Sequence, residues 1–179
     1  MLSRISLLIL GSAFFVLAAS SAILLYSSIK STTHLDGQLS AQPGSEGDFI
    51  VNVGDRVFFK PKQVELSAAA LDTLTRQAAW LKKYTYVRMR ISGHTDEQEW
   101  YGDISEWKKK REQGIDRQLG LKRAQAVQEA LVKWGILRER LEIESWGWEH
   151  PVALCDAESC WSQNRRVVLI MCGVKGSPC

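Results

Sequence analysis

Four short segments of the chain carry the apolar patterns that predict β-strands. They are rich in β-branched and aromatic residues, or they alternate apolar with polar residues, and turn-forming or polar residues bound them. The predicted strands are residues 53–59, 87–92, 141–145 and 167–171. Because the last run is apolar without interruption, it predicts a central strand that is covered on both faces.

Two longer segments repeat apolar residues at three- and four-residue steps, which is the period of an amphipathic helix. The first follows Ser67, a predicted N-cap, and places Leu71 and Leu74 on its buried face. The second spans residues 119–134 and ends at Gly135. The order β-α-β-α-β-β predicts an α/β sandwich, in which a mixed sheet carries both helices on one face and right-handed crossovers join the strands.

The beginning of the chain follows a different pattern. Residues 5–26 are almost continuously apolar and uncharged, between Arg4 and Lys30. At about 1.5 Å per residue they cover the ~30 Å hydrocarbon core, so we predict a membrane helix with residues 1–4 in the cytoplasm. Small residues at 18–22 leave a second interpretation open, in which this segment is a cleaved signal peptide. In both interpretations the rest of the chain is exported from the cytoplasm.

The remainder divides into a linker, one domain and a tail. Residues 27–48 are rich in Ser, Thr, Gly and Gln and have no hydrophobic period, which predicts a flexible linker. Residues 49–173 suffice for one globular domain, and 174–179 form a tail. The net charge of +3 is small and the basic residues are scattered, so we expect no nucleic-acid partner. The basic run 108–111 is typical of a solvated surface.

The cysteines favour an oxidising compartment. Cys155 and Cys160 are separated by four intervening residues in a polar loop and predict a disulfide, with free thiols as the alternative. Cys172 and Cys179 flank a Gly-containing tail, and the sequence leaves their pairing open. A zinc site made from His150 and three of the cysteines lacks paired Cys-x-x-Cys spacing, so we predict no metal.

A polar tetrapeptide follows the second predicted strand. Residues 93–96 read Gly-His-Thr-Asp, and Arg123 lies one turn into the second helix. A carboxylate and a guanidinium held close together can bind a zwitterionic amino acid, because Asp96 accepts from its ammonium and Arg123 donates two hydrogen bonds to its carboxylate. That clamp requires both charges to be unpaired. Two structural alternatives remain: the two residues pair with each other, or Asp96 caps the following turn.

Several motifs along the domain together resemble a known family. They are Arg-Val-Phe-Phe at 56–59, Gly-His-Thr-Asp-Glu at 93–97, Gly-Leu-Lys-Arg-Ala-Gln-Ala-Val at 120–127, and Trp-Ser-Gln-Asn-Arg-Arg-Val at 161–167. In order and content the chain resembles the peptidoglycan-associated lipoproteins (Pal) of the Tol-Pal system, which carry an OmpA-like domain. The cysteine-flanked stretch at the end is similar to the alphaproteobacterial branch of that family.

The resemblance implies a domain that binds peptidoglycan in the periplasm, without catalysis and without a cofactor. The implied ligand is the diaminopimelate of the stem peptide. The family's binding Asp and Arg fall on Asp96 and Arg123 of this chain. The resemblance also assigns four weaker ligand contacts, which are His94, Thr95, Asn164 and Arg165.

The chain departs from this family in three places. No Cys lies near the end of the apolar segment, so we expect the helix rather than a lipid to be the anchor, in a membrane that the sequence does not identify. Lys60, Pro61 and Lys62 replace the acidic residues expected after the first strand. The segment 97–116 is longer than usual, and it is either a cover for the ligand groove, a protein-binding element or a surface elaboration.

Other function classes fit the sequence less well. A partner resembling the TolB propeller is implied by the same resemblance, so an envelope interaction module with reduced wall binding is the second hypothesis. A motor stator would need an ionisable residue inside the membrane, and residues 5–26 contain none. We expect no enzyme, because no Ser or Cys nucleophile lies in a recognisable triad context.

Overall fold

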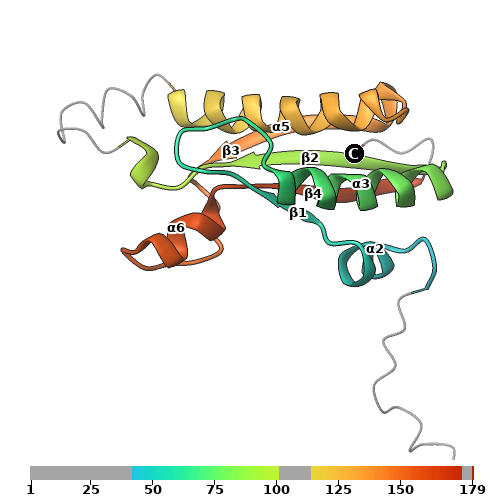
Figure 1. Ribbon diagram of the computed structural model, residues 1–179, viewed down its shortest axis with the longest axis horizontal. Helices are drawn as coiled ribbons and strands as arrows, with labels where there is room; N and C mark the ends of the chain where they lie inside the picture. The colour runs from blue at the N-terminus through green and yellow to red at the C-terminus, as the bar shows by residue number, and fades with distance from the viewer. Residues whose placement is uncertain (1–41, 101–113, 175–178) are drawn as a thin grey trace, which may run out of the picture. The chain divides into compact units, whose positions relative to one another are not determined.

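The computed structural model describes residues 42–100, 114–174 and 179 (Figure 1). In chain order the helices and strands are α2 (Glu46–Asn52), β1 (Arg56–Phe58), α3 (Ala68–Lys83), β2 (Val87–His94), the 3-10 helix η2 (Gln98–Trp100), α5 (Ile115–Lys133), the 3-10 helix η3 (Arg138–Arg140), β3 (Leu141–Gly147), α6 (Glu158–Asn164) and β4 (Arg166–Val174). All four predicted strands and both predicted helices are present. The predicted order is therefore confirmed, and α2 and α6 are additional short helices.

Some predictions fall on residues that the structure does not describe. They concern the membrane segment 5–26, most of the linker 27–48 and the greater part of the segment 97–116. Within the described ranges, no helix combines the length and the apolar content needed to cross a membrane.

The four strands form one mixed sheet in the order β1-β4-β2-β3. β2 and β3 are parallel, whereas β4 is antiparallel to both of its neighbours, β1 and β2. The mixed sheet is as predicted, and β4 does lie in its interior. The prediction that both faces of this strand are covered is wrong, because Ile170 is 37% exposed on the face that carries no helix.

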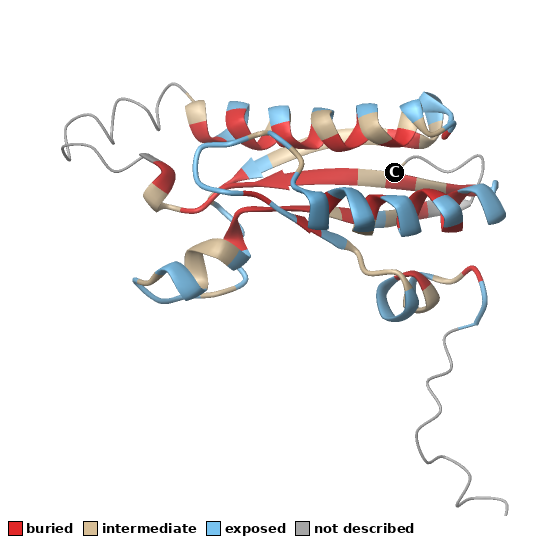
Figure 2. Ribbon diagram, viewed as in Figure 1, coloured by how far each residue is buried: buried red, intermediate tan, exposed pale blue. Residues whose placement is uncertain are grey.

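Helices α3 and α5 cover the other face of the sheet, as predicted (Figures 1 and 2). Their buried sides contribute Leu74, Leu81 and Leu131 to a core that also contains Met89 and Ile91 of β2. Figure 2 shows the buried residues of both helices on the sides that face the sheet.

Local signals set the ends of these helices, with two differences from the prediction. The Ser67 side chain accepts a hydrogen bond from the Ala70 N–H at 3.2 Å, so the predicted N-cap is confirmed. Leu71 is exposed, and Ala70 takes its place on the buried side. α5 begins at Ile115 rather than at 119, because its first turn is polar and lacks the apolar period that marks the rest of the helix.

A close backbone contact fixes α5 against β2. A Cβ atom added to Gly93 would collide with the backbone of Gly120, and one added to Gly120 would come within 3.1 Å of the Gly93 carbonyl carbon. Only two glycines allow helix and strand to approach this closely. The contact places Arg123, less than one turn further along α5, beside the carboxyl end of β2.

The domain begins slightly earlier than the predicted boundary at residue 49. Ser45 caps α2 by accepting from the Asp48 N–H at 3.2 Å. Phe49 is buried and packs edge-on against Trp80 of α3, with 4.9 Å between ring centroids. The Trp80 indole also donates to Asp48 at 2.8 Å. Residues 46–48, which the composition assigned to the linker, are thus part of α2.

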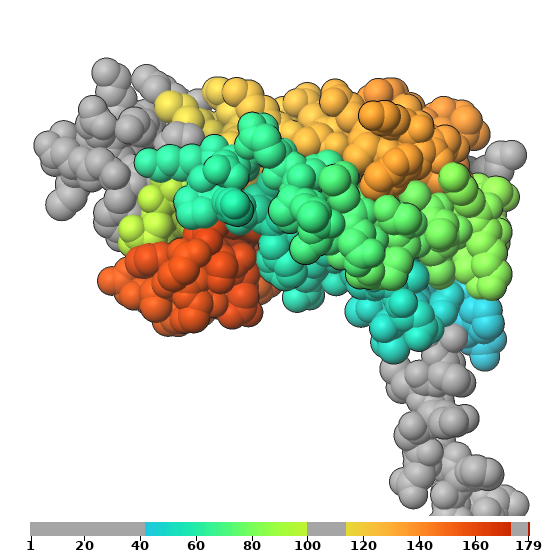
Figure 3. All heavy atoms as spheres, viewed as in Figure 1, coloured from blue at the N-terminus to red at the C-terminus, as the bar shows by residue number. Residues whose placement is uncertain are grey.

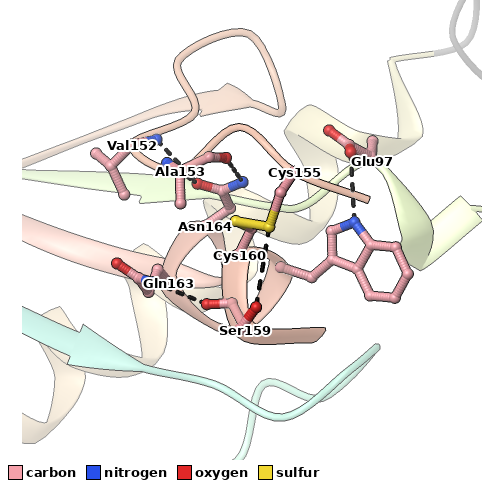
Figure 4. Close-up of a disulfide and its surroundings, with 9 residues drawn as sticks. Glu97, Val152, Ala153, Cys155, Ser159, Cys160, Gln163 and Asn164 are labelled. Atoms are coloured by element: carbon pink, nitrogen blue, oxygen red, sulfur yellow. Dashed lines mark hydrogen bonds between the residues drawn. A yellow bond between two sulfur atoms is a disulfide. The ribbon is translucent and has the colours of Figure 1, made fainter. Parts of the chain in front are cut away.

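All four cysteines form disulfides. Cys155 and Cys160 are joined as predicted, with 5.7 Å between their Cα atoms, and they close a small loop at the start of α6 (Figure 4). A second disulfide joins Cys172 and Cys179 and settles the pairing that the sequence left open. No cysteine is therefore free.

Candidate functional site

Arg123 is a fully buried arginine whose five N–H groups all have acceptors. Nε donates to the Gln63 carbonyl at 2.9 Å, Nη1 to the His94 carbonyl at 3.1 Å, and Nη2 to the Lys60 carbonyl at 3.2 Å. The two remaining N–H groups form a two-pronged ion pair with Glu99, through Nη1 at 2.8 Å and through Nη2. The ring of Phe59 lies 5.2 Å from the guanidinium. Arg123 is therefore held as a rigid receptor for a carboxylate.

Glu99 is the residue that occupies this receptor, and its carboxylate is completely buried. Besides the Arg123 contacts, Oε1 accepts from the Lys62 N–H at 2.7 Å and Oε2 accepts from the Asp96 N–H at 3.3 Å. Lys62 has a φ of 58°, a conformation that residues other than glycine rarely adopt. The carboxylate is thus fully hydrogen-bonded, as a buried charge has to be.

Asp96 is also buried and already paired. Its Oδ2 accepts from Nη1 of Arg165 at 2.5 Å, and its Oδ1 accepts from the Glu99 N–H at 2.6 Å at the start of η2. The sequence left two structural alternatives open. The structure contains one of them, in which Asp96 caps the following turn. Asp96 pairs with Arg165 and Arg123 pairs with Glu99, so the clamp residues are near each other but neither charge is free.

Arg165 links Asp96 to α6. It forms an ion pair with Glu158 and donates through Nε to the Phe59 carbonyl at 3.2 Å. Burial alone would lower the pKa of the Arg165 guanidinium, but its hydrogen bonds and ion pairs with Glu158 and Asp96 outweigh burial and raise it. Arg165 is therefore positioned beside the site, as the resemblance implied, and its role as a ligand contact stays a prediction.

Asn164 and Thr95 occupy different environments near the same end of the sheet. The Asn164 side chain accepts from the N–H groups of Val152 and Ala153 at 2.8 and 3.1 Å and donates to the Ala153 carbonyl at 2.9 Å (Figure 4). Those bonds fasten the loop before α6. The Thr95 hydroxyl is buried and has no partner among the described residues. Their predicted contacts with a ligand stay predictions.

A cavity adjoins the Arg123 receptor. It has a volume of about 390 Å³, and its lining includes Lys60 and Gln63, the residues whose carbonyls hold Arg123. Phe58, Glu65 and Ser162 of α6 also line it. Figure 3 shows the α6 region beside the segment that follows β1. The basic Lys60 at this edge stands where the family resemblance led us to expect an acidic residue.

His94 points into a different hollow, on the face of the sheet without helices. This hollow has a volume of about 400 Å³, and its lining also includes Arg56, Arg90 and Arg166. Burial, followed by the charge of Arg166 and by His150, lowers the pKa of His94 to about 3, so its imidazole is neutral. His94 contacts Arg123 through its backbone carbonyl, which accepts from Nη1 at 3.1 Å. Its predicted role as a ligand contact stays untested.

Sequence reasoning missed Glu99, the residue that completes the site. It lies in a polar stretch without periodicity, and its partner Arg123 is 24 residues away. A general physical signal was available, because an anionic partner offsets much of the cost of burying an arginine. If Arg123 is buried on α5, an acidic residue is expected near it, and Glu99 follows the end of β2 closely.

Comparison with known proteins agrees with this architecture. The model of the OmpA family matches residues 58–165, and the chain belongs to this family. Its relatives include peptidoglycan-associated lipoproteins. That of Agrobacterium fabrum is 42% identical over 139 residues, which cover 78% of this chain and 72% of the relative. That of Rhizobium meliloti is 44% identical over 137 residues, covering 76% and 71%. The resemblance noted in the sequence is confirmed.

Solved structures give the same result. The peptidoglycan-associated lipoprotein from Burkholderia pseudomallei is similar with a TM-score of 0.55 and 32% identity, over 65% of this chain and 89% of that one. The C-terminal domain of Helicobacter pylori MotB has a TM-score of 0.55 at 19% identity, over 66% and 84%. At that identity the second likeness indicates a shared fold and nothing about function.

Proposed function

We propose that this chain binds peptidoglycan non-covalently through its OmpA-like domain, as a binding protein and not as an enzyme. The bound group is the zwitterionic end of diaminopimelate in the stem peptide. Its α-carboxylate pairs with Arg123 and its ammonium with Asp96. The names of the relatives support this proposal, because they describe proteins associated with peptidoglycan.

One observation of the structure carries the proposal at the level of residues. Arg123 already binds a carboxylate with two prongs, in a buried setting and beside Asp96. Three backbone carbonyls fix the guanidinium, so little side-chain entropy is lost when it binds a carboxylate. The cavity next to Lys60 and Gln63 offers space for the stem peptide.

Cosedimentation of the full-length protein with purified peptidoglycan tests this proposal. We expect the wild-type chain to bind with roughly micromolar affinity, about 8 kcal/mol. Asp96→Asn keeps the shape of the side chain but removes its charge, and Arg123→Lys keeps the charge but removes the two-pronged guanidinium, so each should reduce binding about tenfold or more.

Asp72→Asn is the matched control, because Asp72 is an exposed carboxylate on α3 that pairs with Arg76 across one helical turn. This variant should bind like the wild type. Thermal unfolding of each variant separates a lost contact from a lost fold. Undiminished sedimentation of both folded site variants would contradict the proposal.

A second candidate function is an envelope interaction module that has lost or reduced its wall binding. The observation that favours it is the pairing of both clamp charges inside the protein, Arg123 with Glu99 and Asp96 with Arg165. Crosslinking in intact cells discriminates between the two functions. A TolB-like protein captured from the domain surface, without wall fragments at Asp96, would favour the second.

The proposal includes a location for the domain. We place it in the periplasm of the cell envelope, tethered by residues 5–26 through the linker, where it contributes to envelope integrity in or akin to the Tol-Pal system. The two disulfides support an oxidising compartment. The mass of the mature protein tests the tether, since cleavage near residue 22 would remove it.

A further inference from the structure

The Glu99 side chain lies where the proposed ligand's carboxylate would have to lie. It is completely buried, and its two oxygens accept four hydrogen bonds: two from Arg123, one from the Lys62 N–H and one from the Asp96 N–H. An α-carboxylate offers the same two oxygens at the same spacing. It could therefore accept the same four bonds, but only after Glu99 has left.

The backbone of Glu99 blocks the second half of the clamp. Its N–H donates to Oδ1 of Asp96 at 2.6 Å, while Arg165 occupies Oδ2. If Glu99 moves away, Oδ1 loses its donor and becomes available to a ligand ammonium. One displacement thus frees both Arg123 and Asp96.

We propose that Glu99 is an internal competitor for the clamp, so that peptidoglycan binds by exchanging its α-carboxylate for that of Glu99. This inference rests on the proposed wall-binding function. It explains why Arg123 and Asp96 are both in place while Glu99 occupies their hydrogen-bonding groups. It also makes Glu99 the residue that sets the affinity of the site.

The segment around Glu99 is held to the rest of the domain by weaker contacts. Gln98 donates to Asp156 at 3.3 Å on the surface. The Trp161 indole donates to Glu97 at 3.3 Å, and Figure 4 shows this bond at Glu97. Both bonds are at the long end of the normal range. η2 itself is a single 3-10 turn of three residues, whose hydrogen-bond geometry is poorer than that of an α-helix. Among the contacts of the described residues, the main barrier to displacement is therefore the set of hydrogen bonds made by the Glu99 carboxylate and by the Glu99 N–H.

Competition of this kind makes the site selective. The open form is only a fraction of the population, so the apparent affinity of every ligand falls by that fraction. A ligand that has a carboxylate but no ammonium replaces the Arg123 contacts but leaves Oδ1 of Asp96 unpaired. Ligands that carry both groups are favoured, because only they replace everything that Glu99 provides.

The test is a binding titration of the full-length protein with meso-diaminopimelate and with pimelate, which has the same chain without the ammonium groups. Cosedimentation with purified peptidoglycan runs in parallel. Glu99→Gln removes the competing charge but keeps an acceptor for the Lys62 N–H, so it should tighten binding about tenfold or more. Pimelate should bind more weakly than meso-diaminopimelate in every variant.

Glu97→Gln is the matched control. Glu97 lies two residues before Glu99, and its carboxylate contacts Trp161 instead of Arg123, so the variant removes the same charge without touching the Arg123 site. We expect it to bind like the wild type. A merely structural role of Glu99 would give weaker binding in Glu99→Gln, because a damaged site loses affinity. Weaker or unchanged binding by Glu99→Gln, or equal tightening by Glu97→Gln, would overturn the inference. In either case, binding by the wild type would still uphold the proposed function. If neither the wild type nor any variant binds, both fail.

Discussion

Two buried arginines, Arg123 and Arg166, lie near the same end of the sheet but have very different partners. Arg123 donates to three backbone carbonyls and to both oxygens of Glu99. Arg166 donates to the carbonyls of His150 at 3.1 Å and Asn164 at 3.4 Å, and its Nε has no partner among the described residues. Burial and the nearby charge of Arg56 lower the pKa of Arg166 to about 10, although Asp55 acts in the opposite direction.

This difference distinguishes Arg123, which can bind a carboxylate, from Arg166, which holds the backbone of a loop. A buried charge is tolerated well when a counter-charge and hydrogen bonds compensate for its lost hydration, and Arg123 has both. Arg166 makes no ion pair with a carboxylate of the described residues, and its hydrogen bonds hold the backbone around His150, in the loop between β3 and α6. Burial alone therefore does not identify a binding arginine. The set of acceptors around it does.

Replacing Arg123 with Met should have the largest effect on stability. The substitution leaves the Glu99 carboxylate buried without its counter-charge, which costs about 3–5 kcal/mol in the free energy of unfolding. Urea denaturation of the full-length protein measures this loss. A loss below 1 kcal/mol would mean that Glu99 escapes to solvent at little cost.

The neutral His94 in the second hollow predicts a loss of stability in acid. Its pKa is about 3 in the folded protein and near 6.5 in the unfolded chain, so the unfolded chain binds the proton first and stability falls as the pH drops from about 6.5 towards 3. Between pH 7 and pH 4 the wild type should lose on the order of 3 kcal/mol more than His94→Gln. Equal losses in urea titrations at the two pH values would contradict this environment for His94.

A double-mutant cycle measures how much of the Arg123 effect comes from the ion pair. Adding Glu99→Gln to Arg123→Met removes the stranded charge, so the double variant should recover about 1–3 kcal/mol relative to Arg123→Met alone. Additive losses in the denaturation curves would show that the two residues stabilise the fold independently.

Replacing Arg166 with Met should have the smallest effect, within about 1 kcal/mol, since the lost hydrogen bonds are offset by removal of a buried charge that Asp55 compensates only in part. The same variant should raise the pKa of His94, because the charge of Arg166 contributes to lowering it. Denaturation and a histidine NMR titration measure the two effects. A loss as large as that of Arg123→Met would remove the distinction between the two arginines.

The sequence predicted the architecture because its signals are local. Period-two and period-3.6 patterns identified the strands and helices, and Ser67 marked a helix start by its own chemistry. The short helices α2 and α6 escaped prediction because each has only seven residues, too few for a helical period to be recognisable.

The candidate site was only partly predictable. Asp96 and Arg123 were found through family motifs, but their pairing with Arg165 and Glu99 depends on contacts 69 and 24 residues apart in sequence. No rule based on local sequence predicts which residues pair across separations of this size. Arg166 is adjacent to Arg165 in sequence, and only the alternation of β4 sends it to the opposite face of the sheet.

The contact between Gly93 and Gly120 has a consequence for how this binding site can diversify. The main chain of one strand rests directly on the main chain of one helix there, so the position of Arg123 depends little on which side chains surround it. Side chains of the loops that carry Lys60, Asp96 and Glu99 can therefore change in charge while the backbone of Arg123 keeps its place, provided that the Lys60 and Gln63 carbonyls still hold the guanidinium. New ligand preferences can evolve, or be engineered, by changing those side chains around an arginine whose backbone is fixed.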